Sequence, residues 1–230
     1  MYRNLCVEQE ASILKKEIKI CLPIYKLIYS MSFILILSFV RGIESVNEIG
    51  AVIQAPIALL AVIFCADTYL TEVQNHRAEI FHLYDTKRKS KVIIRRLMLQ
   101  NIYLFGISLI GYGFFYLQKP IVLNGTPQGL LFFLFALAMI GTLLFWSILS
   151  MTICNLWKNM WAGIGTTLLL WIFFSSQFGA QIFGKWNVFS YTFRPIEYIS
   201  DMGWLCGEML SVALAMLMVA LVPVIIKKRG

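Results

Sequence analysis

Long apolar stretches separated by short polar breaks are the main pattern of this chain. A helix that crosses a bilayer needs about 20 predominantly apolar residues. Six stretches reach about that length when short polar breaks are allowed, which predicts six membrane-spanning helices. They cover residues 23–41, 49–69, 97–117, 129–153, 160–183 and 205–226. The expected fold is an all-α integral membrane protein with a single transmembrane domain over residues 1–230.

The residues before the first span have the spacing of an amphipathic helix. Apolar side chains recur at intervals of three and four residues, at Val7, Ala11, Leu14, Ile18 and Cys21. This interval places them on one helical face, with charged residues on the other side. We therefore expect the segment 5–22 to lie along the inner membrane surface. The alternative is a loosely ordered tail that precedes the first span.

One strongly charged segment, over residues 70–96, separates the second span from the third. It contains both histidines and seven of the 20 lysine and arginine residues of the chain: Arg77, Lys87, Arg88, Lys89, Lys91, Arg95 and Arg96. A charged segment of this length does not enter the hydrocarbon region. It is the part of the chain that we expect to contact a soluble partner.

Composition supports the membrane assignment. Hydrophobic residues make up 59% of the sequence and the mean hydropathy is +0.75, far from the values of soluble domains. The formal net charge of +8 is interpreted as a topology signal together with attraction to anionic lipid headgroups. Binding of nucleic acid is not expected.

The distribution of cations predicts the orientation, because Lys and Arg near short loops are retained on the cytoplasmic side. If both termini are cytoplasmic, all but four of the 20 cations lie inside. The four outside are Arg41, Lys119, Lys185 and Arg194. This asymmetry favours six spans with both termini in the cytoplasm.

Two groups of polar residues near the second span are candidate sites. Glu72, His76 and Glu79 fall on one face of a helix that continues the span, and such a trio contains metal-ligating side chains. No cysteine or further histidine completes the set, so a solvated polar face is preferred. Asp67, at the end of the span, is interpreted as a hydrated structural residue rather than a functional acid.

A short apolar cluster, Ile80, Phe81, Leu83 and Tyr84, precedes the charged run over residues 85–91. An apolar centre with a charged rim is typical of a docking element. The alternative is that the cluster folds back onto its own helices while the basic run lies near lipid headgroups.

This layout resembles the membrane subunit of ABC-2 type transporters. The resemblance rests on the order of an amphipathic helix, two spans, the segment EIFHLYDTKRK over residues 79–89, and four further spans. In that family the segment at this position is a cytoplasmic coupling helix, which sits in a groove of a separate ATP-binding subunit. The resemblance implies that the contacts are made here by Glu79, Phe81, Tyr84, Asp85, Thr86, Lys87 and Arg88.

The segment over residues 184–204, between the fifth and sixth spans, is expected at the outer interface, where its tyrosine and tryptophan residues suit the headgroup level. The resemblance implies short re-entrant helices that cap a pathway. Candidate pathway or gate residues are Gln177, Gln181, Glu197 and Asp201. Glu208 is placed at the same wet interface.

The chain contains no GxxxxGK[ST] motif and no GxSxG motif. We therefore expect no enzymatic activity and no cofactor in this chain, with ATP and Mg²⁺ held by a partner ATPase. The predicted function is that of a permease subunit of an ATP-driven ABC exporter in the bacterial plasma membrane. Its substrate would be an amphipathic or hydrophobic peptide, bacteriocin-like compound, drug or lipid. The expected partners are the cytoplasmic ATPase, a second or homologous permease, and membrane lipids.

Two other function classes stay open. An intramembrane enzyme acting on lipid or peptide would use Asp67, Glu72 and His76. A non-transporting anchor or sensor would recruit a cytosolic ATPase through the charged segment without moving cargo.

Overall fold

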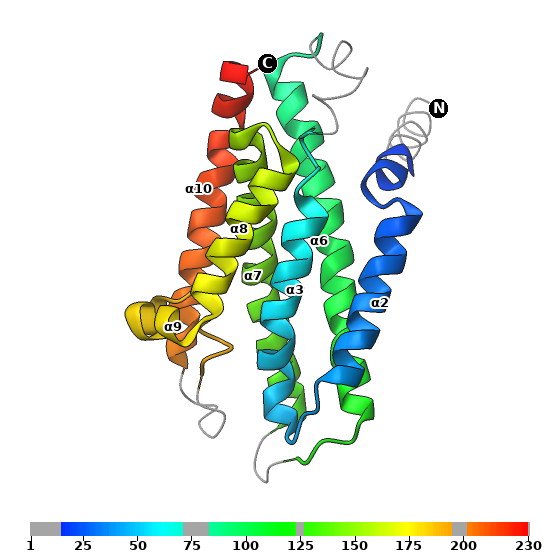
Figure 1. The fold of residues 1–230 in the computed structure, drawn as a ribbon, viewed down its shortest axis with the longest axis vertical. Coiled ribbons are helices and arrows are strands. Elements are labelled where there is room, and N and C mark those ends of the chain that lie inside the picture. Colours follow the sequence, from blue (N-terminus) through cyan, green and yellow to red (C-terminus); the bar gives the residue numbers. More distant parts are fainter. Residues whose placement is uncertain (1–14, 71–82, 123–126, 195–201, 230) are drawn as a thin grey trace, which may run out of the picture.

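Long helices that lie roughly side by side make up most of the computed structural model (Figure 1), which describes residues 15–70, 83–122, 127–194 and 202–229. The described part contains no β-strand, and a short helix over Lys15–Cys21 precedes the long ones. The long helices are α2 (Ile24–Val40), α3 (Ile49–Cys65), α6 (Thr86–Leu117), α7 (Gln128–Trp157), α8 (Met160–Ser175) and α10 (Leu205–Arg229). The described part also contains a shorter helix, α9 (Gln177–Phe183), and three 3₁₀ turns, η1 (Val46–Glu48), η2 (Gly184–Trp186) and η3 (Met202–Trp204).

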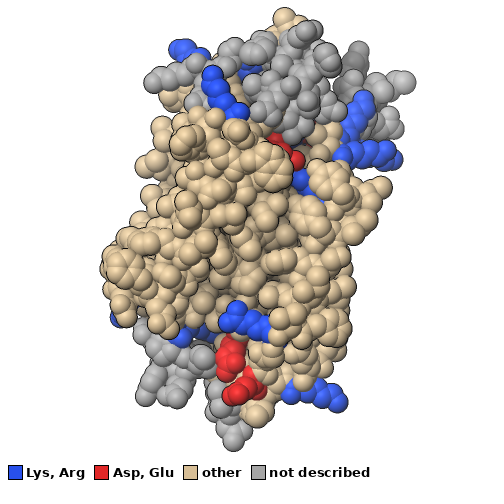
Figure 2. Space-filling model, viewed as in Figure 1, with Lys and Arg blue, Asp and Glu red and all other residues tan. Residues whose placement is uncertain are grey.

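Within the described residues, four helical segments are long and apolar enough to cross a membrane: Val46–Cys65, Thr86–Leu117, Gln128–Trp157 and Met202–Lys227. Two bent helix pairs, Lys15–Cys21 with Ile24–Val40 and Met160–Ser175 with Gln177–Trp186, raise the number to six if each pair is one span. In Figure 2, charged side chains lie near both ends of the visible face and leave a wide uncharged band between them. The protein is therefore built as a membrane-embedded helical bundle.

Helix α3 is the centre of the bundle. Its side chains Ile53, Ile57, Ala58 and Ala61 are completely buried. Side chains from three other helices also donate hydrogen bonds to its backbone carbonyls: Lys26 to Phe64 (2.7 Å), Ser150 to Val62 (2.6 Å) and Trp171 to Ala55 (2.9 Å). Since such bonds are not exchanged with water inside a membrane, they fix α3 against α2, α7 and α8.

The predicted fifth span is not a single helix. The chain bends by 71° between α8 and the segment Gln177–Trp186. Ser176 has an extended backbone at the bend, and its hydroxyl accepts a hydrogen bond from the Gly179 amide (3.1 Å), which caps α9. The expectation of one continuous helix over residues 160–183 is therefore wrong, because a serine cap restarts the helix in a new direction.

Helix α6 begins eleven residues before the predicted third span, at Thr86 rather than at residue 97. Part of the segment predicted as a cytoplasmic loop is thus the first three turns of a 32-residue helix. Its Thr86 end lies at the same end of the bundle as the Arg229 end of α10 (Figure 1). We call this the basic end, because Lys87, Arg88, Lys91 and Lys227 lie there.

Candidate functional site

A group of hydrogen-bonded polar side chains lies inside the apolar bundle. Gln54 of α3 donates from Nε2 to Glu208 Oε1 of α10 (2.7 Å) and to Thr142 Oγ1 of α7 (2.8 Å). Thr192, between η2 and η3, donates to Gln54 Oε1 (2.6 Å). We call these four residues the polar layer. It joins three long helices to the segment that precedes α10.

The side chains of the polar layer are buried, which carries a free-energy cost. Gln54 and Thr142 are completely buried and Glu208 is 5% exposed. Oε2 of Glu208 has no hydrogen-bond partner within the described residues. It faces Gly141 so closely that a side chain at that position would overlap it. Because a carboxyl group inside a membrane protein is expensive to retain, its presence in this layer is a functional signal.

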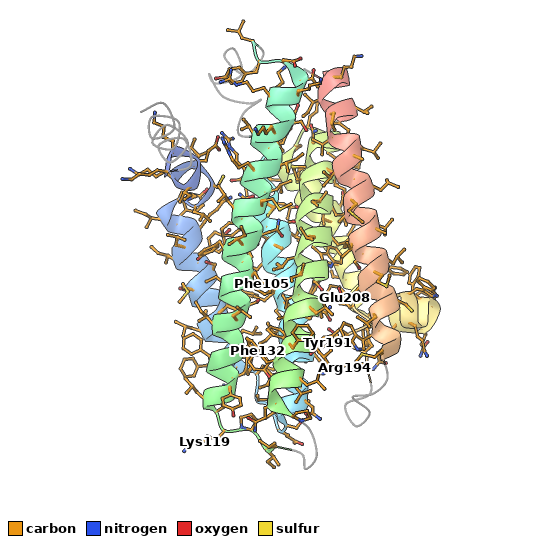
Figure 3. The ribbon with its side chains drawn as sticks, turned by 180° about the vertical axis from the view of Figure 1, so that it is seen from behind. Phe105, Lys119, Phe132, Tyr191, Arg194 and Glu208 are labelled. Carbon is orange, nitrogen blue, oxygen red and sulfur yellow. The ribbon has the colours of Figure 1, made fainter. Side chains whose placement is uncertain are left out.

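The position of Glu208 corrects the sequence-based expectation, which placed it at a wet interface. Figure 3 shows Glu208 inside the bundle beside α7 and α10, with Tyr191 and Arg194 farther toward the end that carries Lys119. Gln54, the only side-chain amide in the predicted second span, was the available signal for this layer. Its pairing with a residue 154 positions away could not be read from helical spacing.

The segment before α10 is folded into the bundle rather than lying over it. Asn187 and Phe189 are completely buried, and the Asn187 carbonyl meets α10 at Gly207, where a Cβ atom would overlap it. Arg194 lies over the ring of Tyr191, with 4.1 Å from its guanidinium carbon to the ring centroid. Burial lowers the pKa of Arg194 and raises the pKa of Tyr191 to about 12.

The structure places two of the four predicted gate residues together. Gln177 and Gln181 lie on α9, not on one face of a long fifth helix, and both line a cavity of about 350 Å³ beside Phe193. They are not members of the polar layer. The other two, Glu197 and Asp201, lie outside the described residues.

Only some of the predicted coupling residues lie within the described part of the chain. Glu79 and Phe81 lie outside the described residues, as do Glu72 and His76. The described ones, Tyr84, Asp85, Thr86, Lys87 and Arg88, lie just before and at the start of α6. Asp85 is the N-cap residue, and Arg88 lies 4.4 Å from the centroid of the Tyr84 ring. No cluster of three metal-ligating residues occurs among the described residues.

Asp67 is engaged in an ion pair that the sequence did not predict. Lys26 of α2 donates from Nζ to Asp67 Oδ1 (2.7 Å) and lies 4.8 Å from the centroid of the Phe64 ring. The Lys26 side chain is 5% exposed and that of Asp67 28% exposed. The ion pair connects α2 to the end of α3, which supports a structural role for Asp67.

Substituting Lys26 with methionine is expected to destabilise the protein by about 1–3 kcal/mol, because the Asp67 carboxylate then loses the Lys26 ammonium group in a mostly buried place. The measurement is the apparent melting temperature in detergent. The double variant Lys26→Met/Asp67→Asn should recover most of the loss. A double variant as unstable as the single one would contradict this role of the ion pair.

Comparisons with known proteins identify no relative: no protein-family model, no curated protein and no solved structure matches the chain.

Proposed function

We propose that this protein is the permease subunit of an ATP-driven exporter in the bacterial plasma membrane, and that a separate cytoplasmic chain hydrolyses the ATP. The substrate would be amphipathic or hydrophobic. The observation that carries the proposal is helix α6, which runs without a break over 32 residues from the basic end into the apolar bundle. It supports a mechanism in which force applied at one end of the protein reaches its interior.

The length of α6 exceeds what a membrane requires. A helix of 32 residues is about 48 Å long, whereas the hydrocarbon core is about 30 Å thick. Its first turns, with Lys87 and Arg88 exposed, are therefore expected to project beyond the hydrocarbon region. An exposed, cationic, rigid projection suits a docking contact with a soluble ATPase.

Two buried hydrogen bonds connect α6 to the helices of the polar layer. Asn101 donates to Ser147 of α7 (2.9 Å), and Thr68, just beyond α3, donates to Gln100 (2.7 Å). A displacement of α6 would thus act on α3 and α7, which carry Gln54 and Thr142. Nucleotide binding by the partner would bias an equilibrium between two arrangements of these helices. A second or homologous permease would complete the pathway.

The first test is purification of the tagged protein from its host in mild detergent, followed by mass spectrometry of the proteins that stay bound. We expect a roughly stoichiometric soluble protein that contains a P-loop. Recovery of the intact, monodisperse chain without an ATPase would contradict the proposal and favour the membrane-enzyme class. If an ATPase binds but no cargo moves in a vesicle flux assay, the anchor class would be favoured.

Reversing the charge of Arg88 tests the docking contact itself. Arg88→Glu is expected to reduce the recovered ATPase at least fivefold, because an exposed cation at the contact is replaced by an anion. Lys89 is left unchanged because it is only 6% exposed. The control is Lys119→Glu, an exposed cation at the opposite end of the bundle. Equal recovery of the ATPase with both variants would place the contact elsewhere.

A further inference from the structure

A cavity of about 570 Å³ lies at the basic end, between the start of α6 and the last turns of α10. Its lining includes Lys87, Ser90, Lys91, Ile94 and Arg95 of α6 and Pro223 of α10. This volume is within the range of small-molecule binding sites. None of the functional residues assigned to the polar layer takes part in it.

The residues that line the cavity include three cations and no acid among the described residues, while most of the exposed wall is apolar. Lys87 and Lys91 are exposed. Arg95 Nη2 forms an ion pair with Glu17 Oε1 (2.6 Å). The buried Nε of Arg95 has no hydrogen-bond partner within the described part of the chain. Ser90 adds a hydroxyl group. Cationic donors together with a hydroxyl suit a phosphate group.

The rest of the lining is apolar and lies at the edge of the membrane-spanning portion of both helices. Ile94 and Pro223 form it. On α6, residues 97–118 carry no charged side chain, and they span about 33 Å as helix, which matches the hydrocarbon core. Arg95 therefore lies where that core meets the headgroups. The ligand expected at this depth has a phosphate at one end and an apolar chain at the other.

We infer that this cavity binds an anionic phospholipid, with its phosphate at Lys91 and Arg95 and an acyl chain against Ile94 and Pro223. Charge complementarity and depth support this occupant, because cations at the level of the headgroups attract anionic lipid. A lipid in this place would connect α6 to α10. The inference does not depend on the proposed export function.

The test is titration of the purified full chain in detergent with single lipids, followed by native mass spectrometry. We expect phosphatidylglycerol to bind at least fivefold more tightly than zwitterionic phosphatidylcholine. Lys91→Gln should weaken phosphatidylglycerol binding about fivefold, the effect of one cation at a membrane surface. Lys119→Gln, which removes an exposed cation at the other end, is the matched control and should leave binding unchanged.

Four results would overturn the inference. Equal binding of the two lipids, or an equal effect of the Lys91 and Lys119 substitutions, would show that the cavity does not select an anionic headgroup. Displacement of the lipid by inorganic phosphate at the same concentration would assign the site to free phosphate. Loss of a bound soluble protein from Lys91→Gln, with lipid binding unchanged, would assign this face to a protein partner. Because Lys91 is not among the predicted ATPase contacts, these results are separable from those for Arg88.

Discussion

Glu208→Ala is expected to lower the apparent melting temperature by about 6–12 °C. The substitution removes the acceptor of the hydrogen bond from Gln54 Nε2 and opens a cavity where three helices meet. An unsatisfied buried polar group costs about 1–3 kcal/mol, and the cavity adds to that cost. A total of about 3 kcal/mol corresponds to this shift for a chain of this size. Thermal unfolding monitored by size-exclusion chromatography in detergent measures it.

The matched variant is Glu208→Gln, which keeps the volume of the side chain and one acceptor oxygen. Its melting temperature should stay within about 3 °C of the unchanged protein, because Gln54 retains its partner. If Glu208→Ala is as stable as Glu208→Gln, the polar layer does not hold α3, α7 and α10 together. If Glu208→Gln is stable but inactive in vesicle flux, the acidic group itself has a role in transport.

Met98→Pro is expected to uncouple the two ends of the protein without preventing assembly. Proline removes the backbone hydrogen bond to residue 94 and kinks a helix, and Met98 is 49% exposed, so little core packing is lost. In the complex with its ATPase, a non-hydrolysable ATP analogue should change amide hydrogen exchange over residues 184–194 of the unchanged protein. In Met98→Pro this response should be reduced at least tenfold, because α6 no longer transmits displacement as one rigid helix.

Met98→Ala is the control, since alanine removes the same side chain and keeps the helix. It should retain the response to the nucleotide analogue. The rigid-helix mechanism would be contradicted by an undiminished response in Met98→Pro with the ATPase still bound. Loss of the ATPase from Met98→Pro would also contradict the expected result, because assembly should survive the kink.

The positions of the apolar helices were predictable from the sequence to within a few residues in most cases. The predicted spans over 23–41, 129–153 and 205–226 correspond to α2, α7 and α10. These predictions succeeded because membrane helices need long apolar runs, a requirement that acts locally along the chain.

The start of α6 and the break at Ser176 were not predictable from hydropathy. A charged segment continues as helix wherever backbone hydrogen bonding is uninterrupted, so the polarity of residues 86–96 marks the membrane boundary but not the helix boundary. The bend after α8 depends on one serine hydroxyl and the close approach of Gly179 to the Phe173 carbonyl. Neither feature changes the mean hydropathy over residues 160–183.

The sequence by itself determined that this is an all-α membrane protein, where its apolar helices lie and where its cations gather, since each property depends on neighbouring residues. Only the tertiary structure decided which polar side chains meet. The pairs Gln54–Glu208 and Lys26–Asp67 join residues from different helices, and the lipid-sized cavity joins the first turns of α6 to Pro223. Such partners are selected by helix packing, because a buried polar group is stable only where another helix supplies its hydrogen bond.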